Sequence, residues 1–281
     1  MTKMKKLASV LLAVVMAMGL AAPAWAAIPV ASVSFNKLCD ADFDFDSQSQ
    51  FRYSTAFARL NDQEYNNIIG NLVMNTDNYV MLAERLEKCG IKVGCIKRIS
   101  PDKTRESGNE IGPNVEDGDI TIIATATQRT GSTNWMVGAA IMFAHKESGP
   151  DTLDIATLYF DSTKANYISY DVGSTGAITL NSGKHGTQGT LVFNYNDQKM
   201  VAGTVYTAMA VIRPTVAKGT RIDFGMDYIH SYSTTSTSLS GFTIQVEFGG
   251  QGAVGGSFGA EFNTSKCEHK FPIADTGSFK V

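Results

Sequence analysis

Histidine is scarce in this chain, with 4 residues in 281, and no grouping of histidines and acids brings a third ligand or a nucleophile to catalytic spacing. Basic residues number 24 against 27 acidic ones, and they form no cluster suited to neutralising a phosphate backbone. After residue 20, no apolar run approaches the roughly 20 residues that span a bilayer as a helix. We therefore expect an interaction protein with no nucleic-acid partner and no helical membrane anchor.

The first 26 residues have the features of a secretory signal peptide. A basic start is followed by an apolar run from Leu7 to about Leu20, and Ala24 and Ala26 suit cleavage after position 26. Removing this segment takes away three lysines and no acid, so the net charge goes from −3 to −6. The chain is thus predicted to be secreted and to act outside the cell or at the cell surface, with the periplasm also open.

Four cysteines remain after cleavage, an even number that indicates two disulfides in an exported protein. Three pairings are possible, and we expect Cys89–Cys95, which closes a short loop, and Cys39–Cys267, which ties the start of the mature chain to its end. Zinc is the alternative. The five residues between Cys89 and Cys95 exceed the usual spacing of two to four, and export favours oxidation.

Residues 27–99 are expected to form an extended lead followed by two helices. Asn61 and Glu64 have the spacing of a capping box, and the apolar residues that follow share one helical face: Tyr65, Ile68, Ile69, Leu72 and Val73. A second helix is predicted over 77–88, with Gly90 just beyond its end. Residues 100–119 are polar and rich in turn formers, which indicates a loop or linker.

From residue 120 to 281 the apolar period changes to two. Ile222, Phe224 and Met226, for example, alternate with Asp223 and Gly225. We predict about eight to ten short strands with turns between them and no internal repeat. The fold class is mainly β (α+β), an antiparallel β-sandwich-like domain with a small helical N-terminal part. Trp135 begins a run that is apolar on both faces, so we expect it in the core rather than at a contact surface.

Four carboxylates occupy alternate positions early in the mature chain: Asp40, Asp42, Asp44 and Asp46. In a loop they would suggest a calcium site, although neither possible window has the glycine and glutamate of an EF-hand. In a strand they would face water while Phe43 and Phe45 face the core, and charges of this kind protect a sheet edge. Both interpretations remain open, and calcium is the only cofactor that the sequence suggests.

The stretch 242–262 allows three interpretations. Gly255–Gly259 fits G-x-S-x-G, so Ser257 is a candidate hydrolase nucleophile, but this motif needs a helix after the serine and the following residues have no helical period. Ser/Thr-rich amphipathic hairpins with a glycine-rich tip resemble the insertion segments of aerolysin-type β-pore-forming toxins, a resemblance confined to 231–265. It would place these side chains toward lipid: Phe242, Ile244, Val246, Phe248, Phe258 and Phe262. The third interpretation is an ordinary hairpin of the sandwich.

Together these features predict a secreted, non-enzymatic binding or assembly protein, such as a surface adhesin, a fibre subunit or an envelope subunit. It would self-associate or bind an extracellular polymer or protein. A pore-forming protein that inserts the 242–262 hairpin is the alternative, and a serine hydrolase that uses Ser257 is a further one.

Overall fold

The structure is a computed structural model that describes residues 33–99, 120–144, 154–173, 176–182, 189–232, 238–248, 254–263 and 269–281. At residues 182, 197, 229–232, 238–248, 254–263 and 269–275 the structure describes only the backbone and not the side chains. The chain divides into two units, Met1–Ser34 and Phe35–Val281. The predicted signal peptide, the 100–119 linker and Cys267 lie outside the described residues.

The described helices are η3 (Phe35–Cys39), α2 (Ser47–Phe57), α3 (Asp62–Met74), α4 (Tyr79–Lys88) and the short η6 (Asp197–Lys199). The described strands are β1 (Ile91–Ile99), β2 (Ile120–Arg129), β3 (Trp135–Phe143), β4 (Asp154–Phe160), β5 (Ala165–Val172), β6 (Ile178–Ser182), β7 (Thr190–Tyr195), β8 (Val205–Pro214), β9 (Arg221–Tyr232), β10 (Ser238–Phe248), β11 (Val254–Asn263) and β12 (His269–Lys280).

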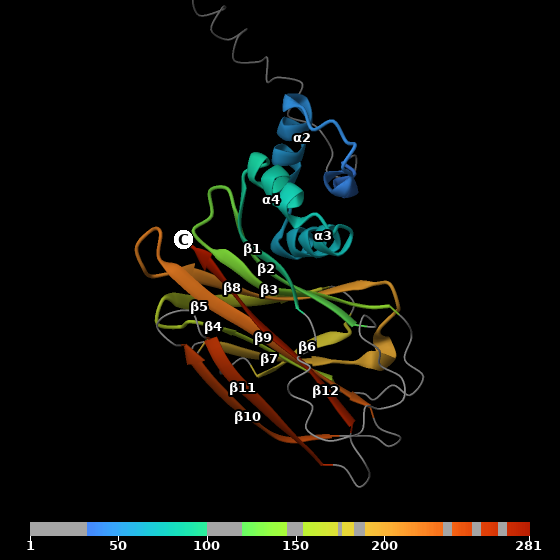
Figure 1. Cartoon of the computed structure of the whole chain (residues 1–281), viewed down its shortest axis with the longest axis vertical. Helices are drawn as coiled ribbons and strands as arrows, with labels where there is room; N and C mark the ends of the chain where they lie inside the picture. Colours follow the sequence, from blue (N-terminus) through green and yellow to red (C-terminus); the bar gives the residue numbers. More distant parts are fainter. Residues whose placement is uncertain are drawn as a thin grey trace, which may run out of the picture. The chain divides into compact units, whose positions relative to one another are not determined.

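Two antiparallel five-stranded sheets form a β-sandwich, which confirms the predicted fold class (Figure 1). Sheet A has the order β1-β2-β3-β8-β5, and sheet B has the order β12-β9-β4-β7-β6. Strand β1 precedes the linker but joins sheet A through β2, so the N-terminal part supplies a strand to the sandwich as well as helices.

The core lies between the two sheets and consists of the alternate residues of each strand that face inward. Trp135 is 2% exposed, and its ring centroid lies 4.3 Å from that of Phe279, so it is a core residue as expected. Tyr195 and Tyr228 meet edge to face at 5.5 Å, and the Tyr228 hydroxyl donates to the buried Asp154 carboxylate. Burying one such large side chain stabilises the fold by roughly 1.5–3 kcal/mol.

Helices α3 and α4 follow the sequence prediction closely. The Asn61 side chain accepts from the Glu64 backbone N–H at 2.9 Å, and the Glu64 carboxylate accepts from the Asn61 N–H, so the capping box is present. Helix α4 starts at Tyr79, two residues later than predicted, because Asn78 is its N-cap. Gly90 follows α4 with a φ of 85°, a conformation that favours glycine.

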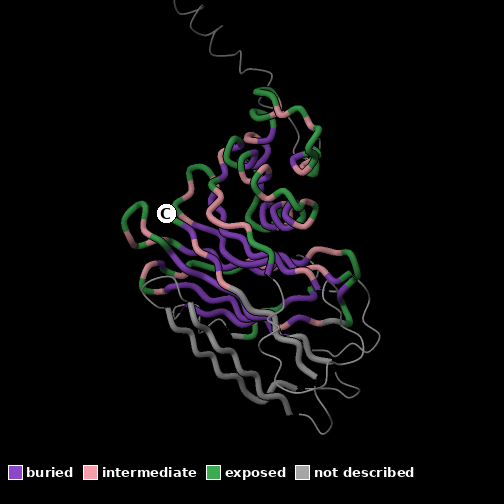
Figure 2. The backbone as a smooth tube through the Cα atoms, viewed as in Figure 1, coloured by how far each residue is buried: buried purple, intermediate pink, exposed green. Residues whose placement is uncertain are grey.

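Helix α3 packs on the outer face of sheet A, over β3 and β8 (Figure 1). Strand β3 is therefore covered on both faces, which explains its continuous apolar sequence and its almost complete burial (Figure 2). Gly70 lies where α3 meets the sheet, and a Cβ there would lie 2.5 Å from Thr207 Cγ2 of β8, closer than two carbon atoms can approach. The absence of a side chain at Gly70 thus permits close packing.

The segment before α3 differs from the sequence prediction. The expected extended lead contains the short helix η3, and residues 40–46 form a turn and an irregular stretch rather than an edge strand. Asp46 then caps α2, since its carboxylate accepts from the Ser49 N–H at 2.7 Å. Helix α2 was missed because its first turn is Ser-Gln-Ser-Gln, and its apolar face begins only at Tyr53.

Strands β10 and β11 form a separate antiparallel hairpin, in agreement with the predicted pairing of this stretch. Strand β11 lies next to β9 of sheet B, and the outward-facing Ile155, Thr157 and Tyr159 of β4 are at most 2% exposed. The outer face of sheet B is thus covered. Across the described residues, no helix is long and apolar enough to cross a membrane.

Candidate functional site

The two sides of the sandwich, where the sheets have their terminal strands, differ in chemistry. On one side β1 lies against β12, and β1 carries the exposed basic residues Lys92, Lys97 and Arg98. The Lys97 ammonium donates to the Thr276 carbonyl at 3.1 Å, which links the two strands. Strand β12 contains Pro272, which has no N–H to donate to an added strand. This side therefore discourages the addition of another strand.

The other side ends in β5 of sheet A and β6 of sheet B, which follow one another along the chain. Within the described residues, β5 pairs with β8 alone. No charged residue occurs between Ala165 and Tyr170. Ile168 and Tyr170 are 42% and 43% exposed, two of the five large apolar side chains exposed to this extent among the described residues. An edge that is both neutral and apolar is a candidate contact surface.

We define the β5 edge patch as Asn166, Tyr167, Ile168, Ser169 and Tyr170. Tyrosine offers a large, rigid contact area at little cost in conformational entropy, and serine and asparagine offer adaptable hydrogen bonds. The Tyr170 ring also packs inward, with its centroid 6.3 Å from that of Phe193 on β7. Partial burial and the neighbouring Tyr170 raise the pKa of the Tyr167 hydroxyl, so this phenol is a neutral donor at physiological pH.

The start of β5 is fixed by the turn that follows β4. The Asp161 carboxylate accepts from the Thr163 N–H at 3.0 Å and lies 2.9 Å from the Lys164 ammonium. Burial alone would raise the pKa of Asp161, but these hydrogen bonds and the Lys164 charge hold it below its usual value. The Asp161 carbonyl also accepts from the Ala165 N–H at 3.2 Å. The first residue of β5 is therefore held in place.

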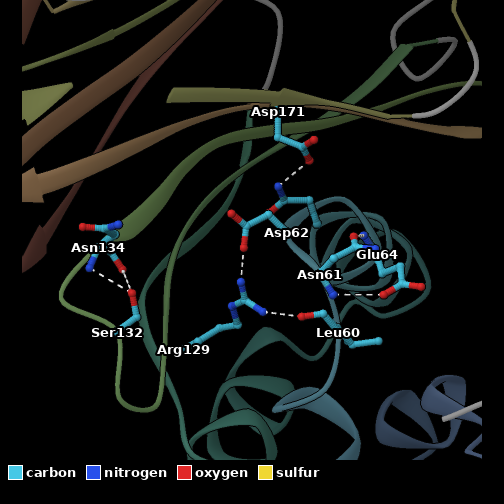
Figure 3. Close-up of polar contacts among 9 residues, drawn as sticks. Leu60, Asn61, Asp62, Glu64, Arg129, Ser132, Asn134 and Asp171 are labelled. Carbon is cyan, nitrogen blue, oxygen red and sulfur yellow. Dashed lines mark hydrogen bonds and ion pairs between the residues drawn. The ribbon is translucent and has the colours of Figure 1, made fainter. Parts of the chain in front are cut away.

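The end of β5 is fixed by helix α3 (Figure 3). The Asn66 amide donates to the Asp171 carboxylate at 2.6 Å, and the Gln63 amide donates to the Val172 carbonyl at 3.3 Å. The start of α3 is in turn held by Arg129 of β2, which binds the Asp62 carboxylate and donates to the Leu60 carbonyl (Figure 3). With both ends held, the β5 edge patch is preorganised for contact.

The Asp171 carboxylate makes the α3–β5 contact sensitive to pH. Burial raises its pKa, and the hydrogen bond from Asn66 lowers it by less. A raised pKa means that the contribution of Asp171 to stability is complete below its ordinary pKa and is lost as pH rises through the raised value. Asp171→Asn does not titrate and can still accept from Asn66. We expect Asp171→Asn to melt at a higher temperature than the wild type at pH 7 and at the same temperature near pH 3. An equal difference in melting temperature at both pH values would contradict this prediction.

The carboxylates proposed as a calcium site do not converge. Asp46 is engaged as the N-cap of α2, and the Asp40 carboxylate accepts from the Asp42 N–H at 3.1 Å. No group of three His, Cys, Asp or Glu side chains suited to a metal ion occurs within the described part of the chain. Calcium binding stays a prediction without a geometric basis among the described residues.

The cysteines lie in different environments. No bond joins Cys89 to Cys95 in the described residues: Cys89 ends α4, whereas Cys95 packs against the sandwich core near Gly277 of β12. Cys39 donates to the Leu72 carbonyl at 3.2 Å. Burial raises the pKa of Cys39 to about 11 and that of Cys89 to about 12, which favours the protonated form of both thiols. The Cys39–Cys267 pairing stays a prediction, because Cys267 lies outside the described residues.

Ser257 lies in the middle of β11, opposite Gln245, and the strand continues on both sides of it. A hydrolase nucleophile of this motif needs a sharp strand-to-helix turn, so the backbone does not fit that role. The membrane-insertion candidates of the hairpin lie at positions where the backbone alone is described, and insertion stays a prediction.

Strand β5 falls in the part of the chain where the sequence predicts short strands, but sequence reasoning missed it as a site. The local signal was the neutral sequence Asn-Tyr-Ile-Ser-Tyr, and its significance depends on β5 being the last strand of its sheet. That position is set by pairing with β8, about 40 residues later in the chain.

Comparison with known proteins gives no family assignment. No protein-family model matches the chain, and a search of curated proteins finds no match. Solved structures give partial matches. The sixth cohesin of scaffoldin B from Acetivibrio cellulolyticus, solved with a dockerin, is 21% identical over 33% of this chain and 70% of its own, with a TM-score of 0.26.

Two streptococcal proteins give similar values. A structure from work on adhesion by Fap1 fimbriae of Streptococcus parasanguinis is 8% identical over 66% of this chain and 89% of its own, with a TM-score of 0.31. The C-terminal domain of the antigen I/II-family protein AspA of Streptococcus pyogenes is 14% identical over 47% of this chain and 41% of its own, with a TM-score of 0.23. TM-scores of this size do not establish a shared overall fold, and identities this low transfer no binding partner.

Proposed function

We propose that this chain is an exported, non-enzymatic binding protein that recognises a protein partner through the β5 edge patch. The observation that carries the proposal is the contrast between the two sides of the sandwich. One side has basic residues and a proline on its terminal strands, whereas the other exposes Ile168 and Tyr170 on an edge strand that has no charged residue from Ala165 to Tyr170. Edges are normally protected against strand addition, so an unprotected apolar edge indicates a contact surface.

The held ends of β5 support the same proposal. Asp161 fixes the start of the strand and α3 fixes its end, so a partner would not have to order this segment on binding. Preorganisation of this kind raises affinity by lowering the entropic cost of association.

The test is Ile168→Lys, which places a charge at the centre of the patch. The labelled mature protein would be incubated with an array of extracellular proteins and glycans and with itself. We expect at least about a tenfold loss of affinity for the partner found, or about 1.4 kcal/mol, because a desolvated charge opposes contact at an apolar centre.

The matched control is Val80→Lys, which adds the same charge at an apolar residue of α4 that is 71% exposed. Both substitutions are at exposed positions and should change stability by less than about 0.5 kcal/mol. Equal binding by wild type, Ile168→Lys and Val80→Lys would show that the partner uses another surface. If the array yields a glycan that binds through the β5 edge patch, the proposed site would be correct and the proposed class of partner would be wrong.

A further inference from the structure

Only a short stretch of β5 has backbone N–H and C=O groups that could pair with an added strand. The Gly173 N–H donates to the Thr207 carbonyl of β8 at 3.1 Å. Because hydrogen-bonding direction alternates along an antiparallel strand, Tyr170 and Val172 point their backbone groups away from β8. The Val172 carbonyl is already bound by Gln63, and a β-bulge between Tyr167 and Ser169 interrupts the strand on the other side. Tyr170 is thus the residue of β5 best placed to offer both N–H and C=O to a partner.

Because so few backbone groups of β5 are available, the strand suits a partner whose own edge strand is already folded. A flexible peptide would pay roughly 1–2 kcal/mol of backbone entropy for each residue that it orders, and one residue's pair of hydrogen bonds returns little of this. A second folded copy brings an equally rigid edge. Its exposed Ile168 and Tyr170 also add apolar contact that a peptide backbone does not supply.

We infer that the partner of the β5 edge patch is a second copy of this chain, bound antiparallel about a two-fold axis at Tyr170; this inference rests on the proposed function. In this register each Tyr170 N–H donates to the Tyr170 carbonyl of the other copy, and Ile168 lies opposite Val172. The two five-stranded A sheets join into one continuous sheet. Cyclic dimers of this type are the commonest homo-oligomers.

The charges along β5 are compatible with this pairing. The edge is neutral from Ala165 to Tyr170, so no like charges lie directly opposite one another. Asp171 lies opposite Ser169 of the second copy, and its carboxylate already accepts the Asn66 amide. On the other side of the sandwich, Lys92, Lys97 and Arg98 would bring basic residues together in a self-pairing of β1. Self-pairing is therefore favoured at β5 over β1.

The test is Tyr170→Cys in the full mature chain. A residue on the two-fold axis meets its own copy with Cα atoms about 5.5 Å apart, within the range that a disulfide bridges. We expect oxidation to convert most of this variant into a disulfide-linked dimer, which reduction returns to monomer. Peptide mapping would place the bond at position 170.

Asn166→Cys is the matched control, because residue 166 is exposed on the same strand. In the inferred register it lies roughly 27 Å from its own copy, at about 3.4 Å per residue, so it should not cross-link. Equal cross-linking of both variants would indicate random collision and would overturn the inference, as would the absence of cross-linking at position 170. Wild type gives the background from the native cysteines.

Sedimentation equilibrium separates this inference from the proposed function. We expect wild type and Val80→Lys to dimerise and Ile168→Lys to remain monomeric. A wild type that stays monomeric overturns the two-fold pairing. The proposed function would then stand if Ile168→Lys still lowered binding to a different protein, and it would fail together with the pairing if Ile168→Lys changed neither readout.

Discussion

Gly138→Ala is expected to destabilise the sandwich by at least about 4 kcal/mol, or to prevent folding. Gly138 lies in the centre of β3, which is buried on both faces. A Cβ at this position would overlap the Ala208 carbonyl oxygen of β8 and lie 2.7 Å from Met209 Sδ and 2.8 Å from Met209 Cα. Two of these three atoms are backbone, so they cannot move without separating β3 from β8. Urea denaturation followed by tryptophan fluorescence would report the change through Trp135.

Gly173→Ala is the matched control for this substitution. Gly173 has no positive φ, and a Cβ there would lie 3.3 Å from the Asn67 side-chain oxygen and 3.5 Å from Thr207 Oγ1. These contacts can relax through side-chain motion, so the cost should stay below about 1 kcal/mol. A Gly138→Ala variant as stable as Gly173→Ala would contradict the close pairing of β3 with β8.

Arg85→Met should destabilise the N-terminal helical part by about 3–5 kcal/mol, because each buried carbonyl left unpaired costs roughly 1–3 kcal/mol. Arg85 is 8% exposed, and its guanidinium donates to the carbonyls of Leu38 at 3.1 Å, Asp40 at 2.6 Å and Phe43 at 3.0 Å. It also lies over the Phe43 and Phe45 rings at 5.9 and 6.0 Å. Methionine keeps most of the apolar volume but leaves three carbonyls without their charged donor.

The expected effect is local. Limited proteolysis of Arg85→Met should cut within 35–57 while the sandwich remains intact, because the cross-links from Arg85 all reach the segment before α2. Lys88→Met removes the same charge at an exposed position of the same helix and should leave cleavage unchanged. Cleavage of both variants at the same rate would mean that the charge, rather than the three hydrogen bonds, holds this segment.

Features set by neighbouring residues were predictable from the sequence. The capping box of Asn61 and Glu64 gave the start of α3, and the period-two pattern after residue 120 gave the sandwich. The alternation of acidic residues between Asp40 and Asp46 was less informative, because these residues form a turn and a helix cap rather than a strand. Propensity alone did not reveal α2, because its stability depends on burying Tyr53, Ala56 and Phe57.

The candidate site depends on pairing between distant segments, which local patterns do not specify. The Asn166–Tyr170 sequence predicts a strand, but it becomes an edge only because β8 pairs with β5 on one side and β3 on the other. The anchors of the strand are equally distant, since Gln63 and Asn66 reach it from more than 100 residues earlier. The residue types of β5 are typical of a contact surface, but only the strand order of the sheet shows that β5 lies at an edge.

Hydrogen exchange of the wild-type protein tests most directly whether β5 is the recognition surface. Amides of residues 165–172 would be followed at low and high protein concentration and with any partner found on the array. We predict that exchange at Tyr170 slows at high concentration or with the partner, while exchange in β1 stays constant. Unchanged exchange across β5 under conditions where the protein is bound, with protection elsewhere, would contradict the account.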